Sequence, residues 1–408
     1  MFVICELTVS NYMKINTSPQ KIQELLARGV EEIINRQDLE KKLLSGKQLR
    51  IKLGIDPTSP NIHIGRSIPL LKMRDFQKLG HQLVLIVGDF TGIIGDTSDK
   101  DSERPMMRRE VIKKNMKGYV EQAAKIIDIK KVEVRHNSEW LKKLTFDKIG
   151  EQADLFSVAE FIARENIKKR LDAGKRVSLR EMLYPLMQGY DSIAIKADVE
   201  LGGTDQRFNL LAGRTMQAHF KQEPQNIMMS PLLEGTDGRK MSSSWGNVIN
   251  LREEPNNMFG QVMSIHDDLI IKYFKLTTRV SSADIIAIEN QLKAGANPRD
   301  VKVKLSQEIV KLYHGEKLAL VAEEAFNKQF RDKEAPEDIK EVNIEYRILN
   351  IADLLMAAKL VSSKSEARRM VEQGGVRIDG NKITEFGQIE VKSGMIIQVG
   401  KRKFVKIK

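Results

Sequence analysis

Cysteine is almost absent from the chain and long apolar runs are missing, and both absences narrow the class of protein. Cys5 is the only cysteine among 408 residues, which excludes a disulfide framework and a cysteine zinc cluster. No apolar run approaches the ~20 residues that a membrane-spanning helix needs. Met1 to Val9 lack a basic region and a small-residue cleavage site, so we expect no signal peptide, and Met13 offers an alternative start. We therefore expect a soluble protein of a reducing compartment, the cytoplasm.

Positively charged residues outnumber negatively charged ones, 67 to 55. The formal net charge is +12 and the isoelectric point lies near 9.4, a balance that favours a polyanionic binding partner without identifying it. With 41% hydrophobic residues in 408, the chain can bury a large core and divide into two or three domains.

The first half of the chain contains the pattern of a parallel sheet. Residues 49–53 and 81–88 are apolar runs that predict strands, and the periodic segment 67–79 between them predicts a helix. Strand, helix and strand in this order form a βαβ unit, so we expect an α/β fold with a doubly wound, Rossmann-type parallel sheet. Ligands of such sheets bind beyond the carboxyl ends of the strands. Residues 18–46, before this unit, are predicted to form one helix.

Glycine-containing turns follow three predicted strands, at 49–53, 81–88 and 199–201, and carry polar residues. His63 precedes a helix, where free N–H groups attract anions, and Gly65 allows a ligand to approach closely. Asp96 offers a charge for an ammonium group, Asp205 can accept from a ribose hydroxyl, and Gln206 can bind a carboxylate. Taken singly, each residue has a simpler alternative as a cap, a turn or a surface group.

Two further stretches extend this set. The loop Gly238-Arg239-Lys240-Met241-Ser242-Ser243-Ser244 combines two cations with three hydroxyls, which suits a polyphosphate, although a solvated loop is the simpler alternative. Tyr184, Gln188 and Asp191 are spaced four and three apart, so on a helix they share one face. A buried aspartate is costly unless it is hydrogen-bonded, so this face either lines a polar pocket or lies on a solvated helix surface.

The end of the chain predicts a small basic module. Residues 349–408 contain twelve Lys and Arg against six Asp and Glu, which gives half of the formal net charge. Arg368 and Arg369 lie on a predicted helix beside a glycine turn, a position suited to contacts with phosphates, although a basic surface is the simpler alternative. The expected segments are a tail (1–17), a sheet domain with inserted helices (18–236), the Lys240 loop with a helical domain (237–331), a linker (332–348) and the small basic module (349–408).

Several of these motifs resemble those of one family. His63-Ile64-Gly65-Arg66 and Lys240-Met241-Ser242-Ser243-Ser244 resemble, in this order, the HIGH and KMSKS signatures of class I aminoacyl-tRNA synthetases. With Tyr184…Gln188…Asp191 and Gly202-Gly203-Thr204-Asp205-Gln206, the chain from about residue 19 is similar to bacterial tyrosyl-tRNA synthetases. Its last sixty or so residues resemble an RNA-binding module first known from a ribosomal protein.

The resemblance implies a Rossmann-type catalytic domain, a helical domain on the anticodon side, a small α+β RNA-binding module and a homodimer formed around residues 119–165. The implied reaction joins L-tyrosine and ATP, accompanied by Mg²⁺, to give tyrosyl-adenylate and pyrophosphate. The tyrosyl group then moves to the terminal adenosine of tRNA(Tyr). No permanently bound cofactor, protein metal site or membrane is implied.

The resemblance also implies roles for individual residues. The catalytic group comprises His63, Arg66, Thr58, Lys240 and Ser243. The ATP-binding group comprises Asp56, His63, Gly65, Gly203, Asp205 and Lys240. The tyrosine-binding group comprises Lys52, Thr91, Asp96, Tyr184, Gln188, Asp191 and Gln206, of which Tyr184, Asp96 and Gln188 are expected at the ammonium and Asp191 at the phenol. The RNA-binding group comprises Arg368, Arg369 and Arg377.

Three positions depart from the family pattern. Arg66 replaces the second histidine of HIGH, and Ser243 replaces the second lysine of KMSKS, so that Lys240 acts without it or Arg239 compensates. Lys52 stands where many members have a tyrosine that contacts the substrate phenol. Three alternatives therefore stay open: a tryptophan-activating enzyme of the same fold, an RNA-binding paralogue without catalysis, and a nucleotidyltransferase acting on another acid.

Overall fold

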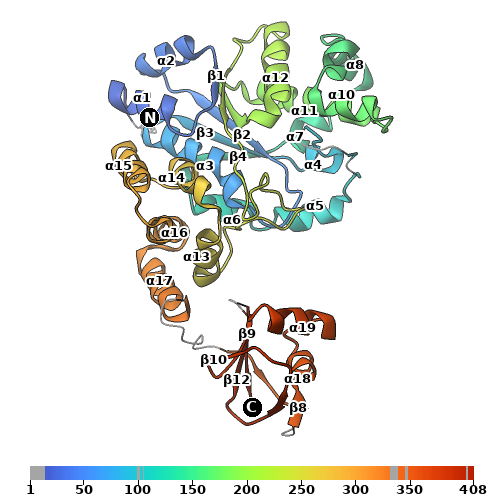
Figure 1. Cartoon of the computed structure of the whole chain (residues 1–408). Coiled ribbons are helices and arrows are strands. Elements are labelled where there is room, and N and C mark those ends of the chain that lie inside the picture. The colour runs from blue at the N-terminus through green and yellow to red at the C-terminus, as the bar shows by residue number, and fades with distance from the viewer. Residues whose placement is uncertain (1–13, 99–101, 104, 331–338, 345–347, 401–402) are drawn as a thin grey trace, which may run out of the picture. The chain divides into compact units, whose positions relative to one another are not determined.

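The computed structural model describes residues 14–98, 102–103, 105–330, 339–344, 348–400 and 403–408. Two compact units emerge, one formed by Met1–Glu254 and Gln261–Gly315, the other by Pro255–Gly260 and Glu316–Lys408. Figure 1 shows their elements in chain order. Most of the expected tail (1–17) and linker (332–348) lies outside the described residues, and the expected division into five segments stays a prediction.

A six-stranded sheet forms the centre of the first unit, in the order β1-β6-β5-β2-β3-β4. Strands β2 to β6 pair in parallel, and β1 adds to the β6 edge antiparallel. The strands are β1 (Glu32–Ile34), β2 (Arg50–Ile55), β3 (Gln82–Val87), β4 (Val132–His136), β5 (Val199–Gly203) and β6 (Asn226–Ser230). The predicted α/β class with a parallel sheet is confirmed.

Helices connect these strands. They are α1 (Pro19–Ala27), α2 (Arg36–Leu44), α3 (Ile64–Lys78), α4 (Thr91–Ile94), α5 (Arg109–Met116), α6 (Tyr119–Ala124), α7 (Ser138–Leu141), α8 (Phe146–Ala153), α9 (Val158–Ile162), α10 (Glu165–Asp172), α11 (Leu179–Ile195) and α12 (Arg207–His219). Helix α3 links β2 to β3 and α12 links β5 to β6, in opposite directions along the sheet. Because such crossovers are right-handed, α3 and α12 cover opposite faces, and the strand order reverses between β2 and β5.

The single helix predicted for 18–46 is wrong. The segment divides into α1, β1 and α2, because Gly29 and Asn35 adopt left-handed backbone with φ of 62° and 61°. Ile33 and Ile34 lie in β1, where they pair with Met228 and Ile227 of β6. Apolar residues in so short a stretch fit a strand as well as a helix face, so periodicity alone could not decide between them.

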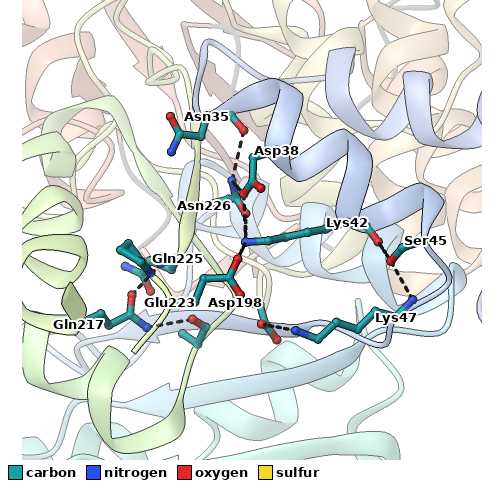
Figure 2. Close-up of polar contacts among 12 residues, drawn as sticks. Asn35, Asp38, Lys42, Ser45, Lys47, Asp198, Gln217, Glu223, Gln225 and Asn226 are labelled. Atoms are coloured by element: carbon teal, nitrogen blue, oxygen red, sulfur yellow. Dashed lines mark hydrogen bonds and ion pairs between the residues drawn. The ribbon is translucent and has the colours of Figure 1, made fainter. Parts of the chain in front are cut away.

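Figure 2 shows ion pairs and hydrogen bonds that join α2 to the loop before β6, at the amino-terminal ends of the strands. Lys42 of α2 pairs with Asp38 at 3.0 Å and with Glu223, in the loop before β6, at 2.7 Å. Its Nζ also donates to Oδ1 of Asn226 at 3.2 Å, and Nδ2 of Asn226 donates to Asp38. These contacts tie α2 to the start of β6, so the opposite, carboxyl edge is the one left for a ligand site.

Helices α14 (Ile270–Thr277), α15 (Ser282–Lys293) and α16 (Pro298–His314) complete the first unit, and α13 (Pro255–Met263) spans the boundary between the units. The second unit continues with α17 (Glu316–Phe330), β7 (Glu341–Val342), β8 (Ile348–Asn350), α18 (Ile351–Ala357), α19 (Lys364–Glu372), β9 (Val376–Ile378), β10 (Asn381–Ile383), β11 (Gln388–Glu390), β12 (Ile396–Val399) and β13 (Lys403–Ile407). Its sheet has the order β10-β9-β12-β13-β7, which confirms a small α+β module. No helix among the described residues is both long and apolar enough to cross a membrane.

Helices α11 and α12 approach each other closely through glycine. A Cβ at Gly189 would lie 2.5 Å from Sδ of Met216 and 3.3 Å from backbone atoms of Ala212 and Gly213. Overpacked contacts of this kind typically cost about 1–3 kcal/mol. We expect Gly189→Ala to lower the free energy of unfolding by this amount, measured by urea denaturation.

Gly150→Ala is the matched control, because a Cβ at this helical glycine meets nothing within 4 Å. Alanine there should raise stability by up to about 1 kcal/mol through helix propensity. Equal effects of the two substitutions would contradict the close approach of α11 and α12.

Candidate functional site

A cavity of about 1130 Å³ opens at the carboxyl ends of β2, β3 and β5, where the strand order reverses. Most residues expected at the site line it together: Asp56, Thr58, His63, Gly65, Arg66, Thr91, Asp96, Tyr184, Gln188, Asp191, Gly203, Asp205, Gln206, Lys240 and Ser243. Lys52 does not line it, and the expected RNA-binding arginines belong to the second unit. The expected residues thus gather beyond the strand ends, where ligands of such sheets bind.

The two signature segments lie side by side. The Ile64 N–H donates to the carbonyl of Ile249 at 2.9 Å, and the Leu251 N–H donates to that of Ile62 at 2.9 Å. The chain leaving the Lys240 loop is thereby fixed against the turn before α3. A Cβ at Gly65 would lie 3.1 Å from Nδ1 of His63, so glycine keeps this junction uncrowded.

His63 caps α3 as a neutral ring. Its Nδ1 accepts from the Arg66 N–H at 3.3 Å, and the side chain is 5% exposed. Burial, followed by the charges of Arg66 and Lys240, lowers the pKa of His63 to about 3. Because Nδ1 accepts, the proton of the neutral imidazole must lie on Nε2, which can donate to an anion in the cavity.

Arg66 lies over the same turn. Its guanidinium donates to Oγ1 of Thr58 at 3.2 Å and approaches the hydroxyl of Tyr119 at 3.5 Å. These contacts hold the charge at the cavity wall beside the helix N-terminus, where an anion is favoured.

Lys240 brings a second cation to the cavity. Its Nζ lies 3.0 Å from Oδ2 of Asp205, the residue after β5 that was expected at a ribose. Ser243, three residues further along the loop, also lines the cavity. Arg239 does not line it: the guanidinium pairs with Asp237 at 2.6 Å and lies 4.8 Å from the ring centroid of Trp245, a lining residue. The structure therefore gives no support to Arg239 as a substitute for the missing lysine.

A hydrogen-bonded chain crosses the cavity wall from Tyr184. The Tyr184 hydroxyl donates to Oδ2 of Asp56 at 2.8 Å, and Oγ1 of Thr91 donates to Oδ1 of Asp56 at 2.7 Å. Nδ2 of Asn137 donates to Thr91 at 2.8 Å and reaches Oδ2 of Asp191 at 3.3 Å. Burial, followed by the nearby charge of Asp56, raises the pKa of Tyr184 well above its ordinary value, so the hydroxyl keeps its proton.

Asp191 is a buried carboxylate with two protein donors. Nε1 of Trp140 donates to its Oδ1 at 2.7 Å, and Asn137 supplies the second bond. Burial raises the pKa of Asp191 to about 7, against the lowering effects of Lys52 and of these donors. Sequence reasoning missed Asn137 and Trp140, although both follow β4 directly, so the rule applied to the other strand ends would have found them.

Asp96, Gln206 and Gly203 complete the predicted set. Asp96 accepts from the Ser98 N–H at 2.9 Å and from its hydroxyl at 2.6 Å, a local turn that still leaves it on the cavity lining. A Cβ at Gly203 would lie 2.5 Å from Oδ1 of Asp205, so a side chain at this position would displace the Asp205 carboxylate. Gln206 lines the cavity beside them.

Lys52 is corrected from a cavity residue to a buried one. It is 0% exposed and pairs with Glu200 at 2.8 Å, on the sheet face covered by α11. A ligand in the cavity does not meet its ammonium, because the side chain bonds to Gln188 and Ser192 of that helix.

The expected RNA-binding residues belong to α19 and β9. Arg368 and Arg369 are exposed on α19, which Ser363 caps, and the guanidinium of Arg368 lies 5.6 Å from the ring centroid of Phe386. Arg377 donates to the carbonyl of Gly380 at 3.0 Å. No group of three or more His, Cys, Asp or Glu side chains in the described part of the chain could hold a metal ion.

Comparisons with known proteins agree with this geometry. Residues 44–331 match the family of class I tRNA synthetases (W and Y), and residues 332–407 match the tyrosine–tRNA ligase SYY-like C-terminal domain. The tyrosine–tRNA ligase of Moorella thermoacetica is 43% identical over 97% of this chain and 98% of its own length. That of Thermotoga maritima is 45% identical over 96% and 98%.

Solved structures share the fold. A truncated mitochondrial tyrosyl-tRNA synthetase of Coccidioides posadasii superposes with a TM-score of 0.61 at 23% identity, over 74% of this chain and 91% of its own. The tyrosyl-tRNA synthetase of Archaeoglobus fulgidus, solved with L-tyrosine, gives 0.60 at 21% identity, over 74% and 99%.

The raised pKa of Asp191 predicts a pH-dependent stability. Between pH 3.8, the ordinary carboxyl pKa, and about pH 7, the folded chain keeps a proton on Asp191 that the unfolded chain releases. The free energy of unfolding therefore falls as pH rises through that window. Asn cannot ionise, so Asp191→Asn should gain stability relative to the wild type by a few kcal/mol, on the order of 2–4, between pH 4 and pH 8. Urea unfolding at both pH values measures this, and a pH-independent difference would contradict it.

Proposed function

The chain belongs to the tyrosine–tRNA ligases of the class I tRNA synthetases, and we propose that its cavity joins L-tyrosine to ATP and passes the tyrosyl group to the 3′ end of tRNA(Tyr). One observation carries the proposal. A single cavity combines a buried carboxylate with two donors, Asp191, and a set of phosphate-attracting groups around His63 and Lys240. The first suits a phenolic hydroxyl in an apolar surrounding, the second a polyphosphate.

Tyrosine would be held by its three polar groups. Asp191 accepts from the phenol, and Asp96, Tyr184 and Gln188 surround the ammonium. Gln206 meets the carboxyl group. Removing the phenolic hydroxyl would leave the buried Asp191 without its ligand donor, which gives the site a physical basis for rejecting phenylalanine.

ATP would enter as its Mg²⁺ complex, with Asp56, Gly65, Gly203 and Asp205 on the nucleoside side. A carboxylate oxygen of tyrosine attacks the α-phosphorus, forms the C–O–P linkage and expels pyrophosphate. Negative charge grows on the phosphate oxygens in the transition state. Nε2 of His63 and the cations of Arg66 and Lys240, with Thr58 and Ser243, are placed to stabilise it, so catalysis is positioning and electrostatics.

The remaining assignments concern assembly. The basic module with Arg368, Arg369 and Arg377 would contact tRNA phosphates. Residues around 119–165 would form a homodimer, which is supported by Phe146 and Val158, exposed at 91% and 74%. Burial of these two side chains in a subunit contact would remove apolar surface from water. We assign the protein to the cytoplasm.

Pyrophosphate exchange with tyrosine, tryptophan and phenylalanine in parallel tests the proposed function. We expect exchange with tyrosine alone. A tryptophan signal instead would assign the other amino acid of this family, and no signal from folded protein would favour an RNA-binding paralogue that has lost catalysis.

Lys240→Ala tests the transition-state role of the loop. We expect the rate of adenylate formation to fall by about 10²–10³, because a charge that stabilises the developing phosphate is lost, while the KM for tyrosine changes by less than about threefold. Single-turnover kinetics measures both.

Arg239→Ala is the matched control, because this neighbouring cation binds Asp237 and does not line the cavity. Its effect on the rate should stay below about tenfold. Equal loss of tyrosine binding and rate in Lys240→Ala would argue against the assignment.

A further inference from the structure

A cluster of buried polar side chains lies outside the cavity lining and has no part in the mechanism above. Lys52 of β2 and Glu200 of β5 form its centre, with exposures of 0% and 1%. The two residues are register partners in the parallel pairing of β2 with β5. Ser192 of α11 and Gln225, before β6, are also fully buried and touch Glu200. The cluster meets the cavity at one residue, Gln188.

The ammonium of Lys52 has no donor to spare for a ligand. Its Nζ bonds to the carbonyl of Gln188 at 2.8 Å, to Oγ of Ser192 at 2.7 Å and to Oε1 of Glu200 at 2.8 Å. A lysine ammonium carries three N–H donors, and all three are used. Lys52 therefore acts on a ligand only through the residues that it holds, above all α11 at Gln188.

The Glu200 carboxylate accepts hydrogen bonds from four side chains. Besides Lys52, its Oε1 receives Nε2 of Gln188 at 3.1 Å, and its Oε2 receives Oγ of Ser192 at 3.1 Å and Nε2 of Gln225. An ionised carboxylate can only accept, so the NH₂ end of the Gln188 amide must face Glu200. The oxygen end is then the one left for a ligand, and no donor among the described residues reaches it.

The buried side chains of the cluster fit against α12 because residue 213 is a glycine. A Cβ at Gly213 of α12 would lie 2.7 Å from Nε2 of Gln225 and 3.0 Å from Oγ of Ser192. The charge of Lys52 would repel a cationic ligand if it stood alone, and the Glu200 carboxylate balances it at 2.8 Å. The cluster is therefore both full and electrically balanced.

We propose that Lys52 and Glu200 are positioning residues that fix the amide of Gln188 with its oxygen toward the ligand, so that the site recognises a cationic amino group. The inference rests on the proposed function, in which that group is the ammonium of tyrosine. A neutral hydrogen-bonding partner at position 200 would let the amide turn over and present donors to the ammonium instead.

The double variant Lys52→Met, Glu200→Met tests this, because two apolar residues of similar volume often replace a buried ion pair without loss of stability. The readouts are the KM for tyrosine in pyrophosphate exchange and the inhibition constants of tyramine and 3-(4-hydroxyphenyl)propionate. Tyramine carries the ammonium and the phenol, whereas the propionate carries the phenol but no ammonium.

We expect the KM for tyrosine and the inhibition constant of tyramine to rise by about tenfold or more, the usual effect of losing a hydrogen bond to a charged group. The constant for the propionate should stay within about threefold. Lys52 lowers and Glu200 raises the pKa of Asp191, so the two removals act on the phenol site in opposite directions. Equal rises for all three compounds, or no rise, would overturn the inference.

Two further variants keep the test decisive. Lys72→Met removes another buried lysine, 4% exposed and bonded to the carbonyls of Leu25 and Arg28, and should leave all three constants within about threefold. If the double variant does not fold, Ser192→Ala loosens the same pair by one hydroxyl, and should raise the constants of tyrosine and tyramine but not that of the propionate. Tyrosine-dependent exchange by the wild type tests the function, whereas the ratios of variant to wild type test this inference.

Discussion

The need of carboxylates for hydrogen-bond donors, two of them buried (Asp191 and Glu200) and one half-buried (Asp56), shapes this unit. Asp56, Asp191 and Glu200 all lie at or below the cavity, and each is satisfied by donors from other elements. A buried carboxylate without donors would cost several kcal/mol, so the strands and helices that supply them must keep their places. These donors include residues of β2, α4, α7 and α11, and the cavity forms where these elements meet. The polar lining of the cavity and the packing of the sheet thus rest on the same bonds.

The sequence predicted the parts of the site that obey local rules. Apolar runs located β2, β3 and β5 within about two residues, and the turns after two of them gave Asp96 and Asp205. Helical spacing placed Tyr184, Gln188 and Asp191 on one face of α11, and all three line the cavity. The two signature loops were recognisable because a helix N-terminus and a glycine turn with cations each carry their own chemistry.

The remainder depends on tertiary contacts that no local pattern contains. Lys52 looked like a ligand because of its position in the family pattern, and only the register with β5 shows Glu200 beside it. Trp140 donates to Asp191, which lies 51 residues later in the chain, and Arg239 stacks on Trp245 without lining the cavity itself. Strand β1 was missed because it forms by pairing with the edge of β6, and the short apolar run at 32–34 contains no local sign of that pairing.

A crystal structure with a non-hydrolysable tyrosyl-adenylate analogue tests the central claim most directly. The account predicts the phenolic oxygen within hydrogen-bonding distance of Asp191, the ammonium at the oxygen end of Gln188, and the phosphate beside Nε2 of His63 and Lys240. An analogue bound with its phenol away from Asp191, or with its ammonium away from Gln188, would contradict it.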